Sequence, residues 1–247
     1  MEKARVKAVT HTAPRESSVS LESSAHDRAD AAHHSAGVRM WKASDRRAYL
    51  IAKRCIDLVI CSVGLLAIAP LFVVIALLIF LLDGRPVFFR REVIGLNGKL
   101  FYMLKFRTMS VQAEEMLQAD PNMYEAYRRQ NYKLRADPRV TRFGQFLRKY
   151  SLDELPQLWN ILRGEMTLVG PRSVPLSEIG EFGAFAPLRQ CVRPGLTGLW
   201  QVSGRADTSY ADRIRLDREY VLHCSLSRDL LILLRTLPCV IRGVGAY

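Results

Sequence analysis

Histidine and cysteine, the residues most often used in metal sites and nucleophilic catalysis, are scarce in this chain of 247 residues. Four of its five histidines precede residue 35, and only His223 lies in the later sequence. A Ser-His-Asp triad or a histidine-rich metal site would depend on that one side chain, so neither is expected. The five cysteines are odd in number and form no Cys-x-x-Cys pair, which predicts free thiols in a reducing compartment.

Large apolar residues are nearly absent from the first 43 positions, which are rich in Ala, Ser, His and mixed charge. A segment of this composition cannot bury a core, so we expect residues 1–43 to be a disordered tail. The tail also lacks the apolar centre of a secretory signal peptide. The remaining length suits one domain with appendages, or at most two small domains.

Acidic side chains are outnumbered by basic ones, 24 to 36, and the net charge is +12. Such an excess favours anionic partners, whether nucleic acid, anionic lipid or phosphorylated small molecules. The sequence has no recognition helix and no RNA-binding aromatic signature. We therefore expect membrane lipid and phosphorylated substrates as partners, and no nucleic acid.

Apolar sequence is abundant between Leu58 and Leu82, where twenty-five residues carry no charged side chain. About 20 apolar residues cross the hydrocarbon core of a bilayer, so this run is a membrane-segment candidate. Pro70 stands in its middle and removes an amide donor, so a helix should kink or break there. The run is flanked by basic residues, namely Arg46, Arg47, Lys53 and Arg54 before it and Arg85, Arg90, Arg91 and Lys99 after it.

Basic residues on both sides bear on the topology of this run, because basic residues favour the cytoplasmic side of a membrane. A straight span would place one basic cluster on the wrong side. A segment that enters, breaks at Pro70 and leaves by the same face satisfies both clusters. The alternative is a single span with a tolerated proline kink. The flanking charges favour the re-entrant form.

The apolar run also sets the domain plan. Residues 44–57 place apolar side chains at helical spacing between basic ones, which predicts an interfacial helix leading into the membrane. We expect residues 44–86 to form this interfacial and re-entrant membrane helix. Residues 87–247 are then left to form a cytoplasmic domain.

Periodicity and turn signals predict the elements of that domain. Asn97-Gly98 divides a stretch rich in Val, Phe and Tyr, residues 87–109, and predicts a β-hairpin. Helical patterns follow over residues 111–133, 143–162 and 210–220. A last amphipathic stretch, residues 226–241, is too short to span and lies either on the membrane surface or in the core. The expected fold class is α+β and mainly helical.

Two neighbouring carboxylates, Asp153 and Glu154, allow two interpretations. Ser151 is followed three residues later by Glu154 and then by an apolar run, which fits a capping box whose carboxylates complement the helix dipole. The alternative is chemical, because a carboxylate can act as a nucleophile and form an acyl-phosphate intermediate. The local pattern alone favours the capping box.

Two loops combine glycine and proline with arginine. Residues 169–173 read Val-Gly-Pro-Arg-Ser, and residues 193–205 read RPGLTGLWQVSGR. Such loops bring backbone amides together, and their arginines give bidentate contacts to phosphate. Each loop alone is weak evidence. With the carboxylate pair and the membrane segment, they indicate phosphoryl transfer to or from a lipid phosphate, with arginines and Mg²⁺ neutralising charge.

These features together make the chain resemble the bacterial sugar transferases, also called monotopic phosphoglycosyl transferases, from about Lys53 to the C-terminus. The motifs that carry the resemblance are Lys53-Arg54-x-x-Asp57, Gly98-Lys99-x-Phe101-x-x-x-Lys105-Phe106-Arg107-Thr108-Met109, Asp137-Pro138-Arg139-Val140-Thr141, Ser151-Leu152-Asp153-Glu154-Leu155-Pro156-Gln157, Val169-Gly170-Pro171-Arg172 and Arg193-Pro194-Gly195-Leu196-Thr197-Gly198. The segment from Gly198 to Arg205 is most similar to single-domain, exopolysaccharide-initiating members that transfer galactose 1-phosphate.

The resemblance implies a reaction. A hexose 1-phosphate, with galactose 1-phosphate expected, passes from a UDP-sugar to undecaprenyl phosphate, with Mg²⁺ as cofactor and UMP as product. Asp153 would be the nucleophile that forms an aspartyl-phosphosugar intermediate, and Glu154 a metal-ordering or acid/base partner. Both would hold the metal. The implied substrate-binding residues are Lys105, Arg107, Arg148, Arg172, Arg193, Arg205 and Asp217. With this resemblance the reactive interpretation of Asp153 is preferred, although the pair could cap a helix and still react.

The resemblance also implies a place for the protein. It would be a monotopic protein of the bacterial inner membrane, with a re-entrant helix broken at Pro70 and interfacial amphipathic helices. Its catalytic domain, residues 87–247, would face the cytoplasm. Two residues depart from the family pattern: Ala69 stands where a serine commonly precedes the proline, and Ser173 stands where a second proline commonly follows the arginine. We expect the first change to leave the break to Pro70 alone and the second to loosen the loop.

The sequence leaves several alternatives open. No motif identifies the sugar, and the oligomeric state is undecided, with a homodimer as one option. A membrane-anchored scaffold for exopolysaccharide machinery is an alternative of another class, and it predicts no release of UMP. A membrane-tethered nucleic-acid-binding protein is a third, which only the net charge supports.

Overall fold

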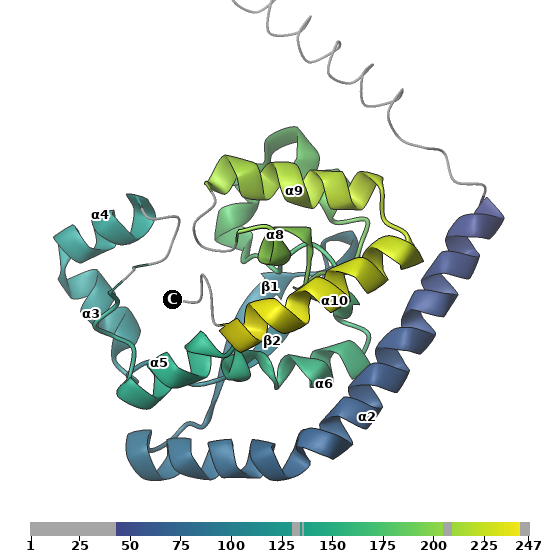
Figure 1. Ribbon diagram of the computed structural model, residues 1–247. Helices are drawn as coiled ribbons and strands as arrows, with labels where there is room; N and C mark the ends of the chain where they lie inside the picture. Colours follow the sequence, from purple (N-terminus) through teal and green to yellow (C-terminus); the bar gives the residue numbers. More distant parts are fainter. Residues whose placement is uncertain (1–42, 130–133, 135, 205–208, 243–247) are drawn as a thin grey trace, which may run out of the picture. The chain divides into compact units, whose positions relative to one another are not determined.

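The computed structural model describes residues 43–129, 134, 136–204 and 209–242. The predicted disordered tail lies outside the described residues, except for Ala43. The helices are α2 (Ala43–Asp83), α3 (Ala113–Ala119), α4 (Pro121–Arg129), α5 (Arg142–Lys149), α6 (Gln157–Leu162), α7 (Ala186–Arg189), α8 (Leu199–Val202), α9 (Tyr210–Leu222) and α10 (Leu226–Arg242) (Figure 1). The strands are β1 (Phe88–Ile94), β2 (Leu100–Phe106), β3 (Thr167–Val169) and β4 (Gly195–Thr197), and short 3₁₀ helices are η1 (Leu96–Gly98), η2 (Leu152–Glu154) and η3 (Leu176–Phe185). The prediction of a mainly helical fold with a hairpin is confirmed.

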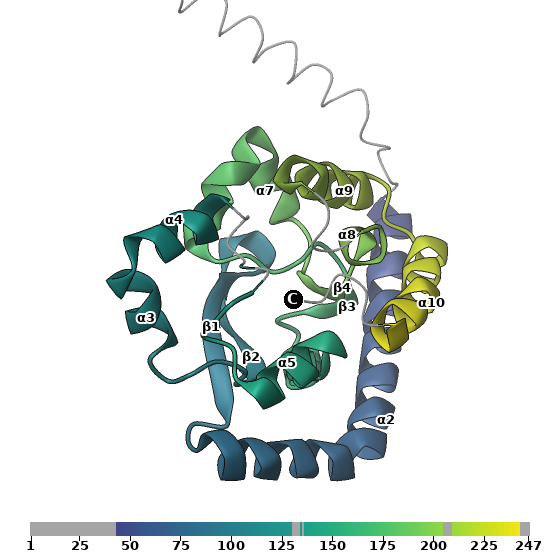
Figure 2. The same ribbon diagram turned by 60° about the vertical axis from the view of Figure 1, so that its left-hand side comes forward.

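Helix α2 is a continuous helix of 41 residues, about 60 Å long at 1.5 Å per residue. The predicted interfacial helix therefore has no boundary of its own and runs directly into the apolar segment. Pro70 lies inside α2, and the ribbon changes direction partway along the helix (Figures 1 and 2). Because proline removes one helical hydrogen bond and clashes with the preceding turn, a kink rather than a full break satisfies this backbone.

The parts of α2 before and after Pro70 are called the first arm and the second arm. Only 11% of the most apolar 18-residue stretch of α2 is buried within the chain, and most of the large apolar side chains of this helix are exposed. The buried minority packs on the rest of the chain. Cys61 of the first arm joins the main core cluster, whereas Ile75 and Ile79 of the second arm pack with Phe106 and Leu147.

Strands β1 and β2 form the predicted antiparallel hairpin, with Ile94 opposite Leu100 at its closed end. Asn97 and Gly98 both have positive φ angles, 56° and 77°. This conformation matches the twist of the strands, and it explains why Asn-Gly is a strong hairpin signal. The prediction made from these two residues is confirmed.

Helix α6 packs against both α2 and β2. Its Asn160 side chain bonds to the main chain of β2, as a neighbouring strand would. The Asn160 amide nitrogen donates to the Tyr102 carbonyl at 2.8 Å, and the side-chain oxygen accepts from the Leu104 amide at 3.0 Å. Since Asn160 is buried, these two bonds fix β2 against α6. The residue that follows Leu104 is Lys105, so this contact also fixes the position of that lysine.

The two loops rich in glycine and proline run side by side, joined by the parallel pair β3 and β4, which the sequence did not predict. A Cβ atom on Gly195 would lie 2.1 Å from the Gly170 nitrogen, and one on Gly198 would lie 2.1 Å from the Gly170 oxygen. Only glycine permits this approach. This pairing brings residues 170–172 and 195–198 into contact.

Candidate active site

The carboxylate pair lies in a tight connection between α5 and α6. Ser151 has a left-handed conformation, with φ 55° and ψ 22°, and its side chain makes no capping hydrogen bond. The capping-box prediction is therefore wrong, because an N-cap residue needs an extended backbone to turn its hydroxyl toward the helix. Asp153 and Glu154 instead occupy η2. A left-handed serine carries backbone strain, which the surrounding packing must hold in place.

The surrounding packing comes from both sides of this turn. Thr141 caps α5 by accepting from the Gly144 amide at 2.9 Å, and its hydroxyl donates to Asp83 at the end of α2, also at 2.9 Å. On the other side, Leu152 and Leu155 pack against the cluster that the second arm of α2 forms. The turn that carries the carboxylates is thus fixed to the end of the apolar helix.

One lysine lies beside both carboxylates. Lys105 Nζ is 2.7 Å from Glu154 Oε1 and 3.5 Å from Asp153 Oδ2. Asp153 is 8% exposed and thus nearly enclosed. An enclosed carboxylate with an ammonium beside it is screened little by water, so their interaction is stronger than at an exposed surface.

Two arginines complete the group. The Arg148 Nε donates to the Thr108 hydroxyl at 2.9 Å, which fixes this arginine at the end of α5. Arg172 Nη2 lies 3.3 Å from Glu154 Oε1, and its guanidinium lies 5.6 Å from the centre of the Trp200 ring. The structure therefore brings Lys105, Arg148 and Arg172 to the carboxylate pair from three separate segments.

These charges act on the pKa of Asp153. Burial raises the pKa of this carboxyl above its ordinary value, and Lys105 opposes that shift most strongly among its neighbours. Glu154 raises the pKa further, while Arg148 and Arg172 lower it. The cations thus favour the ionised carboxylate that nucleophilic attack requires, against the effect of burial.

Other predicted site residues lie elsewhere. Arg107 donates to the carbonyls of Asp83 and Gly84 at 2.5 and 2.9 Å and closes the end of α2. Arg193 Nε donates to the Gly164 carbonyl at 2.8 Å. Asp217 is 1% exposed, with Arg189 Nε 3.5 Å from its carboxylate. Arg205 lies outside the described residues.

Two glycine amides of these loops have partners within the chain. The Gly170 amide donates to the Thr197 carbonyl and the Gly195 amide to the Pro171 carbonyl, both at 2.9 Å. These two amides are bonded within the chain and are not presented to a phosphate. The first loop instead contributes the Arg172 side chain to the carboxylate pair. Ser173, expected to loosen the first loop, donates its hydroxyl to the Met103 sulfur at 2.9 Å.

Sequence reasoning missed three residues that support the site. Trp200 stacks under Arg172 and also under Arg213, whose guanidinium lies 5.2 Å from its ring centre. Arg189 donates from Nη2 to the main-chain carbonyl of Arg172. Trp200 lies within the glycine-rich motif, where an aromatic residue between arginines could have indicated a cation–π contact. No local signal marks Arg189 or Arg213.

Candidate metal ligands are few. Among the described residues, no three His, Cys, Asp or Glu side chains come together in a metal-binding group. Asp153 and Glu154 supply two carboxylates. This is a donor set that suits Mg²⁺ when substrate phosphates complete the coordination.

A carboxylate with cations beside it can act as a nucleophile on a phosphorylated substrate, and α2 is long and apolar enough to cross a membrane. Comparison with known families agrees. The model of the family described as "Bacterial sugar transferase" matches residues 48–243. The chain belongs to this family, and it is a sugar transferase.

Curated relatives cover the same region. The chain is 48% identical over 201 residues to the "Exopolysaccharide production protein ExoY" of Rhizobium meliloti (strain 1021), covering 80% of this chain and 88% of the relative. It is 40% identical over 205 residues to the "Undecaprenyl-phosphate galactose phosphotransferase" of Salmonella typhimurium, covering 82% and 43%. It is also 40% identical over 205 residues to the "UDP-glucose:undecaprenyl-phosphate glucose-1-phosphate transferase" of Caulobacter vibrioides, covering 80% and 72%.

Proposed function

We propose that this protein transfers a hexose 1-phosphate from a UDP-sugar to undecaprenyl phosphate and releases UMP, as the first membrane step of exopolysaccharide biosynthesis. The observation that carries the proposal is the enclosed Asp153 carboxylate with Lys105 beside it and Arg148 and Arg172 acting on it. The names of the relatives support the substrate class. Galactose 1-phosphate is the proposed group, on the likeness of the Gly198–Arg205 segment.

Asp153 acts as the nucleophile in this proposal. A carboxylate oxygen attacks the β-phosphorus of the UDP-sugar, the bond from that phosphorus to the bridging oxygen breaks, and UMP leaves with the bond electrons. A phosphate oxygen of undecaprenyl phosphate then attacks the same phosphorus and frees the carboxylate. Both attacks bring negative charges together, so the cations around the pair stabilise each transition state. An enclosed site also limits attack by water on the acyl phosphate.

Glu154 orders the cations in this mechanism. Its Oε1 lies within reach of both Lys105 Nζ, at 2.7 Å, and Arg172 Nη2, at 3.3 Å. It therefore holds one cation from β2 and one from the loop after β3 on the same side of the pair. When the substrate diphosphate enters, the two cations can turn to its oxygens without moving their backbones.

Mg²⁺ is the proposed cofactor, and Asp153 and Glu154 together with substrate phosphate oxygens would hold it. When bound, the ion would neutralise charge on the diphosphate. Three cationic side chains already face the pair, so the chain's own residues supply part of this neutralisation. Arg107 and Arg193 stay predicted substrate-binding residues, although both bind main-chain carbonyls in the structure. Arg205 also stays a prediction and lies outside the described residues.

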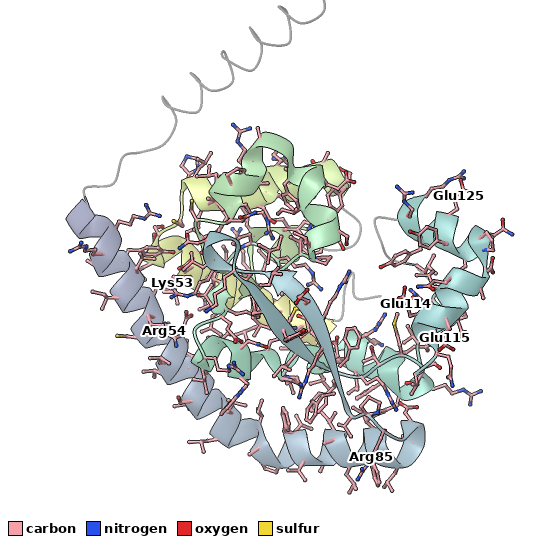
Figure 3. All side chains as sticks on the ribbon, turned by 180° about the vertical axis from the view of Figure 1, so that it is seen from behind. Lys53, Arg54, Arg85, Glu114, Glu115 and Glu125 are labelled. Atoms are coloured by element: carbon pink, nitrogen blue, oxygen red, sulfur yellow. The ribbon has the colours of Figure 1, made fainter. Side chains whose placement is uncertain are left out.

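The protein is proposed to enter the membrane by α2 and leave by the same face. Arg54, labelled on the first arm in Figure 3, donates to the Ile161 and Leu162 carbonyls at 2.6 and 2.9 Å. At the far end, Asp83 accepts from Thr141 of the same domain. In a straight span, these two anchors would lie on opposite sides of about 30 Å of hydrocarbon. Since one domain binds both ends, a bent, re-entrant α2 with the domain at the cytoplasmic face of the inner membrane agrees best with the contacts.

Helix α10 is proposed to lie at the membrane interface. Its inner face is buried through Ile232 and Asp229, yet six large apolar side chains of the helix are exposed. They are Leu226, Leu230, Leu231, Leu234, Leu237 and Ile241. A helix apolar on both faces needs a second apolar partner, and the surface of the bilayer next to α2 provides one.

The test is a UMP-release screen. The full chain in nanodiscs with undecaprenyl phosphate and Mg²⁺ is offered UDP-galactose, UDP-glucose and UDP-N-acetylhexosamines, and UMP is measured. We expect release from at least one sugar, with UDP-galactose preferred. Absence of UMP with every sugar would favour a membrane-anchored scaffold.

A further inference from the structure

A cluster of buried charges lies behind Arg172. Arg189, at the end of α7, is 3% exposed, and Asp217 and Arg213, both on α9, are 1% and 8% exposed. Arg189 Nε lies 3.5 Å from Asp217 Oδ2. Charges so deeply buried are retained only with partners, because an unpaired buried charge is strongly unfavourable.

This cluster reaches Arg172 through its backbone. Arg189 Nη2 donates to the Arg172 main-chain carbonyl while its Nε faces Asp217. A guanidinium presents several donors in a rigid, planar fork, so one arginine can hold a carbonyl and a carboxylate together. Asp217 therefore fixes Arg189, and Arg189 fixes the backbone from which the Arg172 side chain extends.

The same residues reach Arg172 through an aromatic ring. The guanidinium of Arg172 lies 5.6 Å from the centre of the Trp200 ring, and that of Arg213 lies 5.2 Å from it. Burial lowers the pKa of Arg213, which Asp217 raises and Arg172 lowers. Arg172 is thus held at its carbonyl by Arg189 and at its guanidinium by Trp200, which also contacts Arg213. Asp217 interacts with both Arg189 and Arg213.

We propose that Asp217 and Arg189 are positioning residues that aim Arg172 at Glu154, and that Asp217 does not contact the substrate. The inference rests on the proposed function and revises the sequence prediction that Asp217 binds substrate. A carboxylate that is 1% exposed and faces an arginine has no surface to offer a sugar nucleotide. Its effect on catalysis passes through Arg172, whose Nη2 is 3.3 Å from Glu154.

A double-mutant cycle tests this. Full-length Asp217→Asn, Arg172→Ala and the double variant are compared for UMP release in nanodiscs, with the UDP-sugar that the wild type uses. We expect Asp217→Asn to lower kcat/KM by about 10²-fold, the effect of a misplacement of about 1 Å. The double variant should be no slower than Arg172→Ala alone, within about twofold, since the two residues act as a unit. Multiplicative losses would show that Asp217 acts independently of Arg172 and would overturn the proposal.

A second readout does not depend on activity. Hydrogen exchange of a peptide covering residues 168–176 should be faster in Asp217→Asn than in the wild type. It should also be faster in Arg189→Lys, because lysine keeps the charge and loses the fork. The matched control is Glu219→Gln, another carboxylate of α9, whose Oε1 lies 2.8 Å from Arg228 Nη2.

The control separates the positioning of Arg172 from the loss of any ion pair on α9. Glu219→Gln should leave the exchange of residues 168–176 and the kcat/KM of the folded enzyme unchanged. Equal exchange of this peptide in the wild type and in Asp217→Asn would overturn the proposal. If the wild type releases no UMP from any sugar, the proposed function fails, and the exchange result alone decides whether Asp217 positions Arg172.

Discussion

The ammonium of Lys105 lies 2.7 Å from the Oε1 atom of Glu154, and this contact joins the hairpin to the turn between α5 and α6. Charge-assisted bonds of this length are about twice as strong as neutral ones. The two residues are 49 positions apart in the sequence. This contact places a cation from a distant segment beside the two adjacent carboxylates.

Asp153→Asn should abolish UMP release and should not lower stability. The amide cannot attack phosphorus, and it removes a buried charge. Thermal unfolding and UMP release measured on the same sample check both statements, with Glu125→Gln on the exposed surface of α4 as a control. Turnover by Asp153→Asn at the wild-type rate would contradict the covalent mechanism.

The stability effect of Asp153 should depend on pH. Because burial raises its folded-state pKa, the fold favours the protonated carboxyl. The stabilisation that this group contributes is therefore fully present below the ordinary aspartate pKa of 3.8 and lost as pH rises through the folded pKa. We expect Asp153→Asn to gain Tm relative to the wild type as pH rises through that window. A difference in Tm that stays constant with pH would count against a raised pKa.

Activity should fall on the acid side of its pH profile, above the ordinary titration range of aspartate, because protonated Asp153 is not a nucleophile. Lys105→Met should move this acid limb to higher pH, since Lys105 lowers the pKa of Asp153. Lys99→Met, an exposed lysine on the same hairpin, is the matched control and should leave the limb in place. The measurement is kcat/KM for UMP release against pH. An acid limb that does not move in Lys105→Met would separate Lys105 from the titration of Asp153.

Gly195→Ala should destabilise the fold by about 1–3 kcal/mol, the usual range for an overpacked position. The added Cβ would lie 2.1 Å from the Gly170 nitrogen, where a backbone must move. Gly180→Ala is the control, because a Cβ there has no neighbour within 4 Å. Chemical denaturation of both variants measures the difference. Equal stability of the two variants would mean that the loops can separate without loss.

Topology can be tested by cysteine labelling. The five native cysteines are replaced by serine, and Arg85→Cys and Glu92→Cys are made singly at exposed positions after α2. In intact cells, a membrane-impermeant reagent should label neither position, and permeabilised cells should give labelling of both. Labelling of either position in intact cells would refute the re-entrant arrangement and restore a single span.

Local elements were predictable because their signals lie in adjacent residues. Asn97 and Gly98 specify the hairpin turn through their tolerance of positive φ. Helix α9 follows from a polar helical pattern over residues 210–220, and α10 from an amphipathic one over residues 226–241. The Ser151 capping box shows the limit of such reasoning, since the motif is present and the backbone is left-handed. Leu152 and Leu155 pack against the cluster of Ile75, Ile79, Phe106 and Leu147, and this packing outweighs the local preference.

The candidate site was predicted in its parts and not in its grouping. Asp153, Glu154, Lys105, Arg148 and Arg172 were named from the sequence, and the structure brings them together. Arg107 and Arg193, named on the same grounds, bind main-chain carbonyls instead. A motif arginine that binds substrate and one that binds a main-chain carbonyl look identical in the sequence. Sequence alone therefore does not separate the two roles.

By itself, the sequence determined the apolar run from Leu58 to Leu82, the hairpin, the positions of the main helices and the family. These depend on composition, on periodicity and on residues close together in the chain. Only the tertiary structure decided which cations meet Asp153, because Lys105, Arg148 and Arg172 come from different segments that packing brings together. It also decided that Asp217 lies buried behind Arg172, since burial is a property of the packed chain and not of the carboxylate.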